Sequence, residues 1–237
     1  MAKSYPDDCL QSYVGEWWID CASATVSRGR LVWAFVPYID QEPMVLIPQG
    51  RSSPTIHETA QYSVEPLRAS NPPRPPRLPV AGLPTYPGEV RAVYRAKRRP
   101  VLVLSTGGPS VDRELRVGAA RWQTNPTLLV APFFGVDPGP RGGWRPEFVG
   151  RIRRCEYPQY AWDELPIGGS TNSSILNFGQ IQAIGNHPNC YELTSYCLSE
   201  EALTIVDEWI GWLTTGKLDP NGILHEIRKG LIELGDL

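Results

Sequence analysis

The sequence lacks the features that would assign it to a membrane, secreted or strongly basic class of protein. No apolar run approaches the length needed to cross a bilayer, and the opening residues, MAKSYPDDC, contain no apolar core of an export signal. We therefore expect a cytoplasmic protein with no membrane partner. The net charge is only −2, from 23 Lys and Arg against 25 Asp and Glu, which argues against a protein that coats nucleic acid by bulk charge.

Cysteine, histidine and nucleotide-binding motifs are also scarce. The five cysteines are odd in number and irregularly spaced, which fits a reducing compartment better than a disulfide framework. His187-x-x-Cys190 with Cys197 is too loosely spaced for a zinc site, and His57 and His225 have no partner in view. Neither GxxxxGK[ST] nor GxSxG occurs. We expect no metal and no cofactor.

What is present indicates one turn-rich globular domain over 1–237, mainly β with some α. The chain has 24 Pro and 22 Gly, with 41% hydrophobic and 20% charged residues, and it is long enough for a sizeable core. Short apolar runs bounded by turn residues predict strands. The predicted strands are 31–36, 44–47, 88–94, 101–104, 127–134, 148–153, 174–184 and 191–193.

Helical spacing appears near both ends of the chain. Apolar residues recur every three or four positions over 7–21, which predicts an N-terminal helix. Its Trp17-Trp18 pair either packs on the body of the protein or forms a base-stacking or partner surface. A C-terminal helical region covers 199–234, where Ser199 caps a first helix that Gly216 ends, and a second helix follows Pro220.

A long proline-rich insertion is expected over 49–87. Its densest stretch, NPPRPPRLP at 71–79, is typical of an extended surface arm. The alternative is a polyproline helix that docks on an aromatic groove of a partner protein.

Two basic segments are candidate ligand sites. Lys97, Arg98 and Arg99 lead into the apolar strand of KRRPVLVLST (97–106), either as a solvated turn or as a grip on phosphate. In DPGPRGGWRP (137–146), cations and an aromatic side chain alternate, which suits stacking of a nucleobase and holding of its backbone. A lid with an incidental tryptophan is the other interpretation. The residues of this second segment are Arg141, Trp144 and Arg145.

Five segments, in order, resemble the PemK/MazF-like toxin superfamily. They are RGRLVWAFVP (28–37), KRRPVLVLS (97–105), TLLVAPFF (127–134), SILNFGQIQAI (174–184) and LSEEALTIVDEWI (198–210). The resemblance covers about half of the chain and implies a small SH3-like β-barrel, here with the long insertion, the N-terminal helix and two C-terminal helices.

The resemblance also implies a function. Members of this superfamily are bacterial toxins of toxin–antitoxin systems that inhibit growth by cutting single-stranded RNA without metal, through attack of the ribose 2′-hydroxyl on the adjacent phosphate. They usually form homodimers and bind an antitoxin. The position of the family's catalytic arginine is Arg99, and the surrounding residues Lys97, Arg98, Arg141, Trp144 and Arg145 would hold RNA.

Three departures from the family pattern leave the activity open. Phe134 stands where the family has a threonine, Gly29-Arg30 replaces Gly-Asp, and the insertion replaces an acidic loop. Cleavage would require a substitute for the missing groups, and Ser105, the catalytic candidate, Thr106 and Asp137 could supply one. The alternative is a catalytically inactive module that binds RNA or protein, and a barrel enzyme with a small-molecule pocket is a third possibility.

Overall fold

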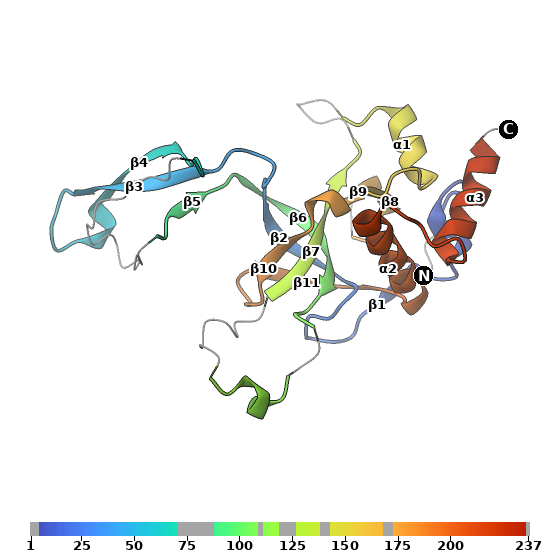
Figure 1. The fold of residues 1–237 in the computed structure, drawn as a ribbon, viewed down its shortest axis with the longest axis horizontal. Coiled ribbons are helices and arrows are strands. Elements are labelled where there is room, and N and C mark those ends of the chain that lie inside the picture. Colours follow the sequence, from blue (N-terminus) through green and yellow to red (C-terminus); the bar gives the residue numbers. More distant parts are fainter. Residues whose placement is uncertain are drawn as a thin grey trace. The chain divides into compact units, whose positions relative to one another are not determined.

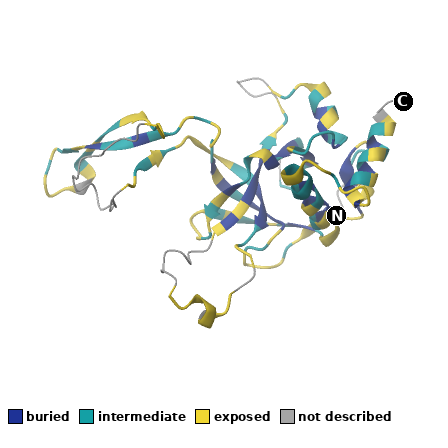
Figure 2. Ribbon diagram, viewed as in Figure 1, coloured by how far each residue is buried: buried dark blue, intermediate teal, exposed yellow. Residues whose placement is uncertain are grey.

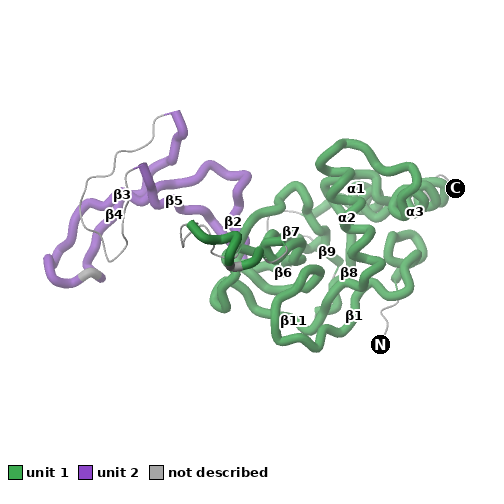
Figure 3. Tube along the Cα trace, turned by 60° about the horizontal axis from the view of Figure 1, so that its bottom comes forward, with its two compact units in different colours: residues 1–35, 98–237 green, residues 36–97 purple. Residues whose placement is uncertain are grey.

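The computed structural model describes residues 5–70, 88–108, 111–118, 127–137, 143–167 and 173–235 (Figure 1). Within these ranges the protein is mainly β with some α, with three α-helices and eleven strands. It divides into two compact units, one of residues 36–97 and one of residues 1–35 with 98–237 (Figure 3). Arg141 and the segment 71–79 lie outside the described residues. No helix in the described ranges is long and apolar enough to cross a membrane.

The larger unit contains an antiparallel sheet, in which strand β7 pairs with three others, β6, β9 and β10. The strand order is β1-β11-β2-β6-β7-β9-β8. The first half of β7 also pairs with β10, whereas its last residues pair with β9, and the sheet curls into a half barrel. The predicted strands at 31–36, 101–104, 127–134 and 191–193 are confirmed. The strands are β1 (Trp18–Asp20), β2 (Arg30–Pro37), β6 (Ala96–Ser105), β7 (Thr127–Gly135), β8 (Tyr160–Glu164), β9 (Ser173–Asn177), β10 (Gln182–Gly185) and β11 (Tyr191–Leu198).

The apolar run of β6 is buried on both faces. Leu102 and Leu104 belong to the main hydrophobic cluster, together with residues of helix α2 (Glu200–Thr215). Val101 and Val103 are fully buried as well, and strand alternation places them on the opposite face. Burial on both faces explains why this strand is continuously apolar instead of alternating.

The C-terminal helical region folds as predicted. Ser199 caps α2 by accepting a hydrogen bond from the Ala202 N–H at 3.2 Å, and Gly216 ends it in the left-handed conformation with φ of +70°. The next helix, α3 (Ile223–Gly235), takes its cap from α2, because the Glu208 carboxylate accepts hydrogen bonds from the Ile223 and Leu224 N–H groups at 3.1 and 2.8 Å.

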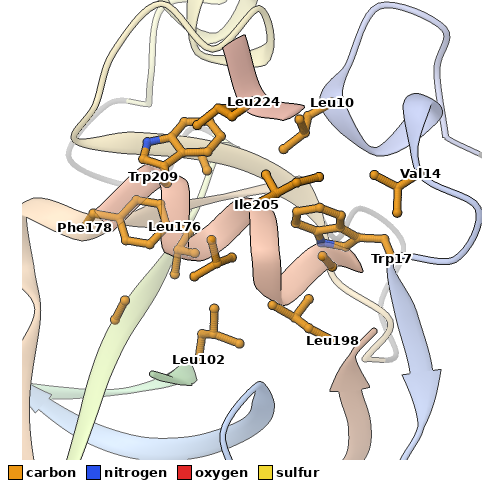
Figure 4. Packing of buried hydrophobic residues seen from close by; sticks show 14 of the residues in the cluster. Leu10, Val14, Trp17, Leu102, Leu176, Phe178, Leu198, Ile205, Trp209 and Leu224 are labelled. Carbon is orange, nitrogen blue, oxygen red and sulfur yellow. The ribbon is translucent and has the colours of Figure 1, made fainter. Parts of the chain in front are cut away.

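Trp209 of α2 is one of the largest buried side chains of the main cluster (Figure 4). Its ring stacks on Phe178 with centroids 5.7 Å apart, and its indole N–H donates to the Pro158 carbonyl at 3.0 Å. Leu176, Ile205 and Leu224 surround the indole in the same cluster. The fully buried indole therefore has both apolar contacts and a partner for its one polar atom.

The predicted N-terminal helix over 7–21 is wrong. The segment forms a single 3₁₀ turn, Leu10–Tyr13, and then β1, in which Trp18 pairs with Leu198 at the edge of the sheet. Both Trp17 and Trp18 donate their indole N–H groups to the buried Asp163 carboxylate at 3.0 Å. These contacts with residues far along the chain outweigh the local helical pattern. Of the two interpretations of the tryptophan pair, packing on the body is the one the structure supports.

Two further segments differ from the predictions. Residues 148–153 form a helix, α1 (Pro146–Arg153), because Pro146 suits the first helical turn and the buried Val149 and Ile152 lie three positions apart. The single strand predicted over 174–184 is divided into β9 and β10 by a 3₁₀ turn, Phe178–Gln180.

A cross-link and a buried arginine tie β1 and the following loop to β11. Cys21 and Cys197 form a disulfide, with Cα atoms 5.5 Å apart, so the fully reduced state expected for the cysteines is not what the structure shows for this pair. Arg30, which is 4% exposed, donates to the carbonyls of Ser23, Thr25 and Thr194. Backbone oxygens thus satisfy the buried guanidinium.

The smaller unit is a three-stranded antiparallel sheet of order β4-β3-β5. Its strands are β3 (Met44–Arg51), β4 (Ala60–Pro66) and β5 (Arg91–Val93). β4 lies inside the expected insertion and was not predicted. Most described residues of these strands are half-buried or exposed, whereas burial is concentrated in the larger unit (Figure 2).

Candidate functional site

Arg99 lies on β6 directly across from Phe134 on β7. The two strands pair with Val101 opposite Pro132, and continuing this register by two residues places Arg99 opposite Phe134. The guanidinium carbon of Arg99 is 4.1 Å from the centroid of the Phe134 ring, and both side chains are half-buried. The aromatic ring therefore holds the cation by its face, in the position where the resembling family has a hydroxyl.

Arg98 is turned to the other face of the strand. Its guanidinium lies over the Trp33 ring at 4.5 Å and donates to the Glu192 carboxylate at 2.6 Å. Alternation along the strand separates neighbouring side chains, and the Glu192 carboxylate neutralises the Arg98 charge. The structure therefore does not bring Arg98 and Arg99 together, and Lys97, which is exposed, belongs to the smaller unit.

Ser105 is at the opposite end of β6 from Arg99. Its hydroxyl accepts a hydrogen bond from the Gly107 N–H at 3.2 Å in the turn that follows the strand. Six residues of extended chain separate the two side chains by about 20 Å. The structure does not bring Ser105 to Arg99, so these two residues do not form one reacting constellation.

A pocket opens between the end of β7 and the start of α1. Its volume is about 760 Å³, and it starts at Gly135, the residue next to Phe134. Trp144 and Arg145, both predicted to bind RNA, are brought together in its wall. The lining residues are Gly135, Asp137, Gly143, Trp144, Arg145, Glu147, Phe148 and Arg151.

Aromatic rings support one side of this pocket. Trp144 stacks on Phe148 with centroids 5.7 Å apart and only 8° between the ring planes. Tyr160 meets both rings edge to face, and Tyr157 packs on Phe148 at 5.0 Å. This arrangement fixes the Trp144 indole at the pocket wall as a flat apolar surface.

Helix α1, which contributes several residues to the pocket wall, packs on the sheet through its apolar face. Val149 and Ile152 of α1 pack in a second hydrophobic cluster with Trp162 and Ile175, which lie on β8 and β9. Arg153 lies over the Trp162 ring at 4.8 Å. The opposite face of α1 is left for Glu147 and Arg151, four residues apart and both exposed.

The charges around the pocket are mixed in sign. Arg145 and Arg151 are exposed cations, and Asp137 and Glu147 are exposed carboxylates. Arg151 donates a hydrogen bond to the Tyr157 hydroxyl, which raises the pKa of the guanidinium above its ordinary value. The Arg151 charge is therefore fixed beside the aromatic wall at any physiological pH.

Sequence reasoning missed three residues of this wall, Glu147, Phe148 and Arg151. Phe148 and Arg151 belong to the segment 148–153, which was interpreted as a strand, and Glu147 directly precedes it. The available signal was Pro146 as a helix start, followed by apolar Val149 and Ile152 three residues apart. Helical spacing would have placed Glu147 and Arg151 on one face.

No metal site accompanies the pocket in the part of the chain that the structure describes, since no group of three or more His, Cys, Asp or Glu side chains gathers there. The chemistry available at this site consists of guanidinium groups, carboxylates and aromatic faces. Such groups bind phosphate, accept hydrogen bonds from a ligand and stack on a planar ring.

Comparison with known proteins supplies no relative from which a function could be carried over. Three kinds of comparison were made, with protein-family models, with curated proteins and with solved structures. No family model, no curated protein and no solved structure matches this chain.

Proposed function

We propose that this protein binds single-stranded RNA at the pocket between β7 and α1, with Arg99 beside it. The observation that carries the proposal is the placement of the stacked Trp144 indole and the cations Arg145 and Arg151 in one pocket. We also propose that the curled sheet is a divergent SH3-like barrel of the PemK/MazF type. Its support is the order of the five sequence segments and the half-barrel of antiparallel strands.

Physical chemistry favours a single-stranded ligand. Stacking of an unpaired base on an aromatic side chain contributes about 1–3 kcal/mol per base, and a base in a duplex cannot reach such a surface. The cations Arg99, Arg145 and Arg151 suit phosphate oxygens. Because only about three phosphates are engaged, the slope of log affinity against log salt should be near −2.

The site favours binding over cleavage. The residue that faces Arg99 on β7 is Phe134, whose side chain can neither donate nor accept a proton. Ser105, the other candidate donor, is at the far end of β6. Each missing transition-state donor costs about 10²–10³ in rate, so we expect RNA cutting far slower than in a toxin with an intact hydroxyl. The geometry therefore supports a growth-inhibiting endoribonuclease less than it supports a protein that binds RNA without cutting it.

The test is fluorescence anisotropy of a labelled U-rich RNA containing all four bases, with a duplex of the same sequence for comparison. We expect the single strand to bind at least tenfold more tightly than the duplex, and Arg99→Ala to weaken it by about tenfold. Arg28→Ala is the matched control, because this exposed guanidinium pairs with Asp207 outside the pocket. Equal affinities for single strand and duplex, or no RNA binding at all, would refute the proposal.

Two further readouts sharpen the result. Incubation of the labelled RNA with protein in chelator, followed by a sequencing gel, reports cleavage directly, and rapid Arg99-dependent cutting would show that Phe134 does not abolish catalysis. Arg98→Ala tests whether neighbouring arginines act as one patch. Because Arg98 is held by Glu192 on the other face, its loss should weaken binding less than the loss of Arg99.

A further inference from the structure

The pocket wall contains carboxylates that a phosphate site does not need. Asp137 and Glu147 line the same pocket as Arg145 and Arg151. A carboxylate repels phosphate, and an ionised carboxylate is a pure hydrogen-bond acceptor. A carboxylate of this wall can therefore accept hydrogen bonds from a ligand group rich in N–H donors, bound beside the cations that hold the ligand's negative charge.

Glu147 and Arg151 present an acceptor and a donor on the same side of the aromatic wall. They are four residues apart on α1, a spacing that puts their side chains about 5–6 Å apart on one helix face. Phe148, also on α1, stacks on Trp144. Arg151 uses one hydrogen bond on Tyr157, and a guanidinium has five N–H groups, so further donors of Arg151 can serve a ligand.

Among the four RNA bases, guanine matches this arrangement best. Guanine has two adjacent N–H donors, at N1 and N2, which suit the two oxygens of one carboxylate, and two adjacent acceptors, O6 and N7, which suit a guanidinium. Adenine and cytosine each offer an amino group beside a ring acceptor that would face the carboxylate. Uracil places its one N–H between two carbonyls. A carboxylate and a guanidinium around one stacking surface thus distinguish guanine from the other three bases.

We infer that the pocket between β7 and α1 selects guanine, with Glu147 accepting hydrogen bonds from N1 and N2, Arg151 donating to O6 or N7, and Trp144 stacking on the base. This inference rests on the proposed RNA-binding function and adds its base specificity. The pocket of about 760 Å³ lies within the usual range of small-ligand sites, roughly 300–1,000 Å³, so a guanosine monophosphate unit has room to enter.

The experiment uses the full chain and a set of short U-rich RNAs that differ in one central base: guanine, inosine, adenine, cytosine or uracil. Inosine is the sharpest comparison, because it lacks only the N2 amino group. One bidentate contact gives about 1–3 kcal/mol of discrimination, so guanine should bind at least about fivefold more tightly than inosine. Binding of guanosine monophosphate alone, measured by calorimetry, should be stronger than that of the adenosine, cytidine and uridine monophosphates.

Glu147→Gln identifies the residue responsible. The amide keeps the shape of the side chain but replaces one acceptor oxygen with a donor, so the preference for guanine over inosine should disappear. The uracil-only RNA should bind this variant somewhat more tightly than the wild type, because the carboxylate no longer repels the phosphates. Glu201→Gln is the matched control, because Glu201 is also an exposed acid in the first turn of a helix, α2. It should retain the wild-type preference.

The outcomes separate the two proposals. If all five RNAs bind with equal affinity, guanine selection is refuted and RNA binding stands. If Glu147→Gln keeps the full preference, the assignment of this carboxylate is refuted. If no RNA binds but guanosine monophosphate does, the pocket selects guanine and the proposed RNA-binding function fails; if neither binds, both fail.

Discussion

The two helices that cover the sheet of the larger unit, α2 and α1, are built for different tasks. α2 has sixteen residues, a serine cap and a left-handed glycine end, and it buries four side chains in the main cluster. α1 has eight residues, Arg145 at its N-cap without a side-chain hydrogen bond, and two buried side chains. Beneath α2 the buried indole N–H of Trp209 is paired within an apolar cluster, whereas α1 borders an open pocket with charged walls.

From this difference we expect that the residues that set stability and those that make the proposed ligand contacts lie in separate parts of the fold. The region beneath α2, centred on Trp209, should set the free energy of unfolding. The region at α1, centred on Trp144, should set binding. Changes in the two regions should therefore differ in their readouts, with the largest loss of stability at Trp209 and the smallest at Trp144.

Trp209→Ala should have the largest effect. The indole is fully buried, stacks on Phe178 and donates to the Pro158 carbonyl, so its removal leaves a large cavity and an unpaired carbonyl. We expect the free energy of unfolding in urea to fall by about 3–5 kcal/mol. A loss below about 1 kcal/mol would contradict the assignment of stability to the region beneath α2.

Reduction of the Cys21–Cys197 disulfide should come next. The bond closes a loop across 176 residues, and removing such a cross-link costs about 2–5 kcal/mol. The expected result is a lower melting temperature in dithiothreitol, and a Cys21→Ser, Cys197→Ser double variant should show the same loss without reductant. An identical melting temperature in both conditions would mean that the cross-link does not form in solution.

Thiol labelling provides the control for that experiment. Burial raises the pKa of the Cys9 thiol to about 11 and raises that of Cys155 further, so both are protonated and slow to react at neutral pH. Cys190 is exposed. The folded, oxidised protein should therefore react rapidly at one thiol. Cys197 is buried in the fold, so the cross-link is counted in denaturant, where reduction should add the two thiols of Cys21 and Cys197 to the other three.

Glu208→Ala should have an intermediate effect, because it removes the acceptor for two N–H groups at the start of α3. The loss of such a cap costs about 1–2 kcal/mol in unfolding free energy. Glu233→Ala, at an exposed position near the end of the same helix, is the control and should change stability by less than about 0.5 kcal/mol. RNA binding should be unaffected by either change, because both residues lie outside the pocket.

Trp144→Ala should have the smallest effect on stability and the clearest effect on binding. The ring is half-buried and stacked on Phe148, so we expect a loss of about 1 kcal/mol in unfolding free energy. Loss of a base-stacking surface should reduce RNA affinity by about 1–3 kcal/mol in the anisotropy measurement. If Trp144→Ala destabilises the fold as much as Trp209→Ala, the separation of stability from binding is wrong.

Much of the fold could be predicted from the sequence where local chemistry and burial agree. The run at 101–104 is apolar because both its faces are buried, and Ser199 and Gly216 mark the ends of α2 in the expected way. The helix prediction for residues 7–21 failed because the conformation of this segment depends on Asp163 and on pairing with β11. Both contacts are made with residues more than 140 positions away. The spacing of apolar residues within a segment cannot predict which distant residues the segment contacts.

The candidate site was predictable only in part, for a related reason. Trp144 and Arg145 could be found because a cation and an aromatic stand side by side in a turn-rich loop. The position of Glu147 and Arg151 on one side of the pocket depends on the helical conformation of α1, which was not predicted. The separation of Arg98 from Arg99, in contrast, follows from strand alternation and was available from the sequence once β6 was assigned.

The ties between β1 and β11 have a consequence for how the chain folds during synthesis. Strand β1 ends at Asp20, but its pairing partner, the Cys197 cross-link and the Thr194 carbonyl that Arg30 holds all come about 170 residues later. This edge of the sheet therefore cannot close until the ribosome has made β11. Completion of the sheet thus waits for β11, its last strand in sequence. In a nascent chain stalled before residue 191, the segment that contains Trp17 and Trp18 has no strand with which to pair.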